Sequence, residues 1–145
     1  MSQVRRSSKE VHAMLEKAKQ DFLVMTSNLD TNTIFNFFVT AYHVMKYVEL
    51  QGKASAEAID KFYKDEDFKM CNYICNKGKH PKMRSALFET QHDKAAVLGE
   101  VCFNEVTLDQ PESYVLITSG RRMDVIPLAQ RILDKWEHFF KENGV

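Results

Sequence analysis

One short segment of the sequence concentrates groups that could act on a phosphate ester. Residues 77–84 contain four Lys or Arg and one His, with no acidic residue: Lys77, Lys79, His80, Lys82 and Arg84. Basic side chains bind phosphate oxygens, and a histidine transfers protons near neutral pH. Alternatively, the lysines complement the C-terminal end of a preceding helix and stay solvated. The segment is therefore either a phosphate-binding loop or a solvated helix end.

The residues that lead into His80 match part of a known family motif. The segment 71–80, CNYICNKGKH, resembles the signature region of HEPN-type domains, which are small helical bundles with an Arg, a polar residue and a His at the end of one helix. Asn76 and His80 match the polar position and the His, and the resemblance spans about residues 7–84. It implies a dimeric, metal-independent ribonuclease, a type common in toxin–antitoxin and anti-phage defence systems. In such enzymes the His and the Arg serve the attack of a ribose 2′-OH on the adjacent phosphate.

The motif is degenerate at its Arg position. Depending on the gap before His80, that position is Cys75, Ile74 or Tyr73, and none of these side chains is cationic. Phosphoryl transfer depends on stabilising charge on the phosphate oxygens, and an Arg does so through bidentate contacts. The sequence thus departs from the family at a residue that supports catalysis.

Three functions follow as hypotheses. The leading one is a dimeric HEPN-like module that binds RNA or a protein partner and has a degenerate catalytic centre. The side chains expected on RNA phosphates are Lys77, Lys79, Lys82 and Arg84. The first alternative is an active, metal-independent endoribonuclease with His80, Asn76 and Lys79 as catalytic residues and no cofactor. The second is a structural subunit whose exposed aromatic side chains pack on a partner.

A polar stripe interrupts an otherwise apolar segment around residues 34–50. Asn36, Thr40 and His43 recur there at helical spacing. Polar groups inside a bundle must find hydrogen-bond partners, so the stripe could be a satisfied network in the core. The other interpretation is that Asn36 and His43 face the helix before His80 and support the site there.

Other candidate chemistry is weaker. Cys71 and Cys75 lie four residues apart near His80, but a structural zinc site needs four protein ligands. Both cysteines are better explained as small hydrophobic side chains buried in the core. Arg131 and His138 are two helical turns apart on one face, expected to be the solvated side of the last helix. The sequence contains no Gly-rich phosphate loop, nucleophile elbow or His-Glu metalloprotease motif. We therefore expect no metal site.

Capping residues and hydrophobic spacing predict the elements that position these groups. Four helices are expected in residues 7–84: one over about 7–27, one from Asp30 or Thr31 to Gly52, a short one capped by Ser55, and one opened by residues 65–67 and ended by Gly78. The second is apolar nearly all round, as expected for the buried centre of a bundle.

The pattern changes after residue 84. Residues 85–125 are expected to form a β-rich insertion, with strand-like residues in 97–106 and 114–117 and a hairpin turn at 119–122. A closing helix is expected over 126–142, with Pro127 in its first turn. The predicted fold class is α+β, in a single domain of residues 1–145. It comprises an antiparallel four-helix core, a small β-hairpin or three-stranded sheet, and a C-terminal helix.

Composition limits the possible functions further. Lys+Arg and Asp+Glu both number 20, and 44% of residues are hydrophobic, as in an ordinary globular domain. Zero net charge argues against binding polyanions by overall charge, yet residues 57–67 sum to −3 and residues 77–84 to +4. Three cysteines make no disulfide framework, and neither a signal sequence nor a membrane span is evident, so we expect a cytoplasmic protein.

Overall fold

The first two helices form an antiparallel pair. The computed structural model describes residues 8–79, 88–90, 114–118 and 121–145. Helix α1 (Ser8–Ser27) is followed by α2 (Thr31–Gln51). Asp30 caps α2 in a capping box, in which its carboxylate accepts from the Thr33 amide at 2.8 Å. Gly52 ends the helix at a φ of 79°, so both predicted ends of the second helix are confirmed.

The next two helices also begin at predicted caps. Helix α3 (Ala56–Tyr63) starts after Ser55, whose hydroxyl accepts from the Ala58 amide at 3.0 Å. Helix α4 (Glu66–Lys77) starts after Asp65, which accepts from two backbone amides of the first turn. Because a capping side chain needs only neighbouring amides, these ends follow from local sequence.

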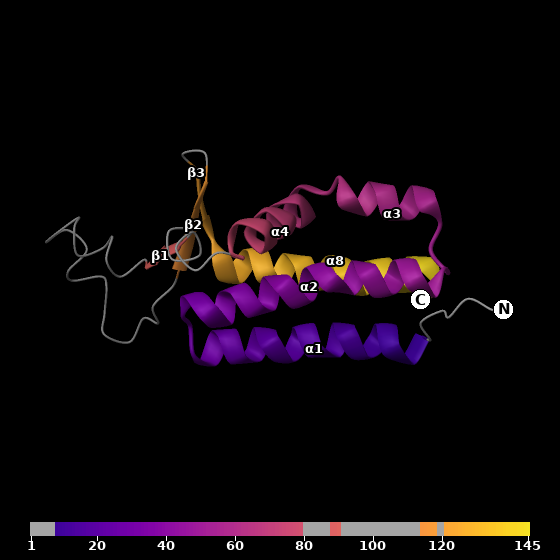
Figure 1. The fold of residues 1–145 in the computed structure, drawn as a ribbon, viewed down its shortest axis with the longest axis horizontal. Coiled ribbons are helices and arrows are strands. Elements are labelled where there is room, and N and C mark those ends of the chain that lie inside the picture. The colour runs from indigo at the N-terminus through magenta and orange to yellow at the C-terminus, as the bar shows by residue number, and fades with distance from the viewer. Residues whose placement is uncertain (1–7, 80–87, 91–113, 119–120) are drawn as a thin grey trace, which may run out of the picture.

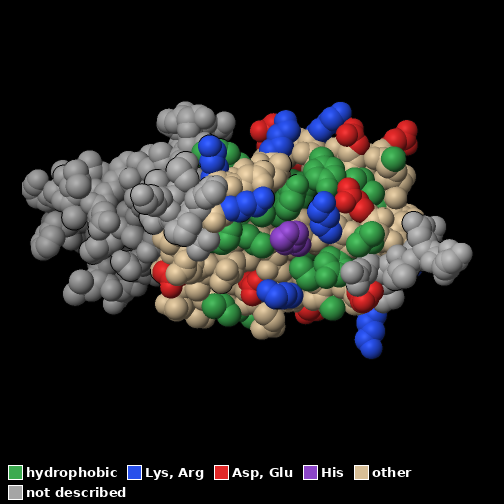
Figure 2. Space-filling model, viewed as in Figure 1, with side chains coloured by type: hydrophobic (Ala, Val, Ile, Leu, Met, Phe, Trp, Pro, Cys, Tyr) green, Lys and Arg blue, Asp and Glu red, His purple; other side chains and the backbone are tan. Residues whose placement is uncertain are grey.

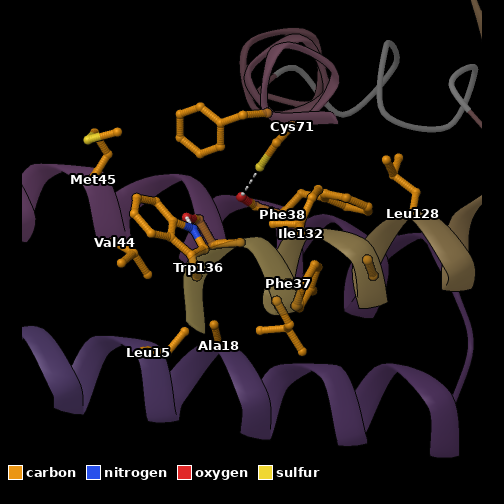
Figure 3. Packing of buried hydrophobic residues seen from close by; sticks show 14 of the residues in the cluster. Leu15, Ala18, Phe37, Phe38, Val44, Met45, Cys71, Leu128, Ile132 and Trp136 are labelled. Atoms are coloured by element: carbon orange, nitrogen blue, oxygen red, sulfur yellow. Dashed lines mark hydrogen bonds between the residues drawn. The ribbon is translucent and has the colours of Figure 1, made fainter. Parts of the chain in front are cut away.

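The last helix, α8 (Val125–Asn143), lies where a closing C-terminal helix was expected, and its buried face is part of the core. Trp136 is fully buried, and its indole N–H donates to the Ala41 carbonyl on α2 at 2.9 Å. Figure 3 shows α8 side chains packed among those of α1 and α2: Trp136 and Ile132 lie near Ala18, Phe37 and Val44. The helical core is thus confirmed, and α8 is part of it.

The helices are arranged around α2. In Figure 1, α1 and α2 lie side by side, α8 runs behind α2, and α3 and α4 lie on the side away from α1. Nine residues of α2 are buried, but Asn36, His43, Lys46 and Glu49 are exposed. The helix is therefore buried against its neighbours and open along one face. Among the described helices, none has both the length and the apolar character that a membrane crossing requires.

Three short strands lie at one end of the bundle (Figure 1). They are β1 (Phe88–Thr90), β2 (Tyr114–Thr118) and β3 (Arg121–Asp124), paired antiparallel in the order β1-β2-β3. Arg121 and Arg122 pair with β2 and so belong to a strand, which corrects their placement in the hairpin turn. The expected strand residues in 97–106 lie outside the described residues. With strands this short, the described fold is mainly helical, and the α+β class stays a prediction.

Candidate nucleic-acid interface

A groove of about 510 Å³ lies between α2 and the C-terminal end of α4. Helix α2 contributes Phe35, Val39, Tyr42, His43 and Lys46. The α4 side contributes Cys75, Asn76 and Lys79. The α2 residues recur at steps of three and four, so they form one face of that helix. The groove is therefore the open face of α2, bordered by the end of α4.

Gly78 allows the end of α4 to approach α2 closely. A Cβ atom at this position would lie 2.3 Å from Cε1 of Phe35 and 2.9 Å from the Ile74 carbonyl oxygen. Gly78 has a φ of −75°, which any residue can adopt, so the need for glycine here is one of space. We predicted Gly78 as a helix end, which is confirmed, but its contact with Phe35 had no signal in the sequence.

The groove is positively charged. Lys46 and Lys79 are exposed, and neither has an ion-pair partner among the described residues. Some other lysines are paired: Lys19 contacts Glu137 at 2.8 Å, and Lys135 contacts Asp65 at the same distance. No acidic side chain is among the described residues that line the groove. Figure 2 shows this face, where a histidine and basic side chains lie among hydrophobic ones. Such a surface attracts anions.

The groove brings together three of the predicted site residues, namely Asn76, Lys79 and His43. The Asn76 side-chain amide donates to Oδ1 of Asn72 at 2.9 Å, which leaves its own oxygen available to a ligand. The ring of His43 lies 6.2 Å from that of Tyr42. Lys46 was missed by sequence analysis because it appeared only as an interruption of an apolar helix.

The other predicted residues lie elsewhere. Lys77 is exposed, and its ammonium group lies 6.0 Å from the centroid of the Tyr73 ring rather than in the groove. Asn36 is exposed and is not among the residues that line the groove. His80, Lys82 and Arg84 lie outside the described residues.

The polar stripe on α2 divides between two neighbours. The Thr40 hydroxyl is buried and donates to Asp21 on α1 at 2.6 Å. His43 instead lines the groove beside α4. Thr40 is therefore a satisfied polar group in the core, whereas His43 lies beside the helix that precedes residue 80. A supporting role of Asn36 and His43 at a site around His80 stays a prediction.

Both described cysteines are buried thiols, as expected. Cys71 is fully buried and its thiol donates to the Phe38 carbonyl at 3.3 Å (Figure 3). Burial raises the pKa of the Cys75 thiol, and the nearby charge of Lys79 only partly opposes this.

Burial likewise raises the pKa of Tyr42, which keeps its phenol protonated at neutral pH. Within the described residues, no group of three or more His, Cys, Asp or Glu side chains could hold a metal ion.

A second cavity, of about 720 Å³, lies between α3 and α8 and carries charges of both signs. Also on α8, Arg131 contacts both carboxylate oxygens of Asp67, at 3.0 and 3.1 Å. Lys135 bridges Asp65 and Asp67, at 2.8 Å from each. These ion pairs join the start of α4 to α8, so Arg131 has a structural partner. His138, which shares its face, contacts Glu142 at 3.1 Å.

Comparisons with protein-family models, with curated proteins and with solved structures found no match to this chain.

Proposed function

We propose that this protein binds RNA through the groove between α2 and α4, without cleaving it. The observation that carries the proposal is a pair of exposed cations, Lys46 and Lys79, in a groove with no acidic side chain among its described lining. Other exposed lysines, such as Lys53 and Lys141, also have no ion-pair partner among the described residues, but Lys46 and Lys79 line the same groove. Phosphate groups of RNA would complete the charge balance there.

The hypothesis of a degenerate HEPN-like dimer remains part of this proposal. Asn76 and Lys79, at the end of α4, line the proposed RNA groove and belong to the segment that resembles the family motif. That segment lacks the Arg of the family motif, which is the reason to propose binding rather than catalysis. A cytoplasmic role in defence or in a toxin–antitoxin system is also a proposal. So is the α+β fold class in a single domain.

The test is RNA binding measured by fluorescence anisotropy. Replacing both groove lysines (Lys46→Gln with Lys79→Gln) should weaken binding about 2- to 30-fold, from about 0.2–1 kcal/mol for each exposed charge contact. The plot of log affinity against log salt, between about 50 and 200 mM, should lose about 1.4 units of slope for two lost contacts with a single strand. The matched control is Lys53→Gln with Lys141→Gln, two exposed lysines outside the groove with the same change in net charge.

Two outcomes would overturn the proposal. Equal weakening by both double variants would show that overall charge, rather than the groove, attracts RNA. An affinity that does not change with salt would show that phosphate contacts are unimportant. The endoribonuclease alternative has its own assay: RNA cleavage in EDTA by the wild type but not by a His80→Ala variant would establish catalysis. If the protein elutes as a monomer in gel filtration at high concentration, the proposed dimer is wrong.

A further inference from the structure

The α2 side of the groove is a strip of ring and branched side chains. Phe35, Val39 and Tyr42 lie on one face, and Phe35 and Tyr42 are two helical turns apart, which is about 10 Å along the axis. Both rings are half-buried. Tyr42 stacks on Phe68 with one side of its ring, at 5.3 Å between centroids and 20° between planes. The packing fixes this ring at the groove before any ligand arrives.

Charged and polar groups border this strip on both sides. Lys46 follows Tyr42 by one turn on α2, and Lys79 lies across the groove, after the end of α4. His43 and Asn76 add ring nitrogens and an amide oxygen, which can bond to the edge of a base. A nucleotide has the same division into a flat apolar ring, polar ring edges and an anionic phosphate.

We infer that the groove takes unpaired nucleotides, from a single strand or a loop of RNA, with a base stacked on Phe35 or Tyr42 and phosphates on Lys46 and Lys79. This inference rests on the proposed function. A base can reach a side-chain ring only when it has left its own stack and its partner strand. A duplex presents its phosphates and 2′-hydroxyls across a wide, shallow minor groove, and it would reach the lysines but not the rings.

The first experiment compares ligands on the wild-type protein. The probes are a labelled single-stranded RNA, the same RNA annealed to its complement, and inorganic tripolyphosphate as a competitor. We expect the single strand to bind about 5- to 150-fold more tightly than the duplex, which is the range for one stacked base. Tripolyphosphate should compete poorly, because it supplies charge without a ring.

The second experiment removes a ring while keeping an apolar side chain. Phe35→Leu should weaken single-strand binding by about 5- to 150-fold, the contribution of one stacked base, and should leave duplex binding unchanged. The control is Phe22→Leu, a half-buried ring on α1 that lies outside the groove. Thermal unfolding of both variants checks that they are folded, and the ligand comparison needs no variant at all.

The outcomes separate the inference from the proposed function. Equal binding of duplex and single strand, still dependent on Lys46 and Lys79, would overturn the inference and leave RNA binding in place. RNA binding that is independent of the two lysines, or absent, would overturn the proposed function and the inference with it. Loss of single-strand preference in Phe35→Leu but not in Phe22→Leu would establish stacking in the groove.

Discussion

Asp67 offers a quantitative test of how α4 is attached to α8. Its side chain is 11% exposed, and the carboxylate is bound by both Arg131 and Lys135. We predict that Asp67→Asn lowers the free energy of unfolding by about 1.5–2.5 kcal/mol at pH 7, the lower part of the range for hydrogen bonds to charged groups. The lower part applies because Arg131 is 47% exposed, so solvent screens its charge.

The pH dependence of this effect has a definite sign. Burial alone would raise the pKa of Asp67, but hydrogen bonds from Arg131 and Lys135 outweigh it and hold that pKa below its ordinary value. The stabilisation is therefore complete well above the unfolded-state pKa of about 3.9 and is lost as the pH falls through the lower, native-state pKa. The difference between wild type and Asp67→Asn should persist at pH 5 and shrink steadily at more acidic pH.

The assay is unfolding in urea, followed by the fluorescence of Trp136, which is the only tryptophan of the chain and is fully buried. The control is Asp60→Asn, which removes an exposed pair with Lys64 at 3.0 Å and should cost no more than about 0.5 kcal/mol. The reasoning is refuted if the Asp67 and Asp60 variants are equally stable at pH 7. It is also refuted if the deficit of Asp67→Asn does not diminish in acid.

Three further substitutions test the core and the groove by the same urea assay. Gly78→Ala should cost about 1–3 kcal/mol, because its Cβ would displace the Phe35 ring, and a neutral result would show that the ring moves freely. Gln51→Met should add about 1–2 kcal/mol, because the buried Gln51 amide has no hydrogen-bond partner among the described residues, and a loss of stability would contradict this. Thr40→Val should cost about 1–2 kcal/mol by removing the buried hydroxyl bonded to Asp21, and an unchanged midpoint would contradict that.

Part of the candidate site could be predicted because it lies in one short segment. Asn76 and Lys79 belong to the same helix end, so a local motif found both. His43 was a candidate because a polar side chain is unusual in an apolar helix. Lys46 was not, because its importance depends on lying opposite Lys79, and only the packing of α4 on α2 brings the two elements together.

The distinction between Thr40 and His43 shows why spacing alone could not resolve the polar stripe. The two residues are three positions apart on α2, so helical spacing alone places them on nearly the same side of the helix. Helix α1 covers Thr40 and supplies Asp21, whereas the side that bears His43 borders the groove beside α4. Which neighbour lies over each side of α2 is a property of the assembled bundle.

By itself, the sequence determined where the helices begin and end. Asp30, Ser55 and Asp65 bond to amides two or three residues away, and Gly52 adopts a left-handed conformation, so each end is a local event. Tertiary structure decided that Trp136 of α8 bonds to α2, that Arg131 pairs with Asp67, and that a groove with no acidic residue in its described lining lies between α2 and α4. Those features join residues far apart in the chain, and they exist only once side-chain packing has chosen which helix faces meet.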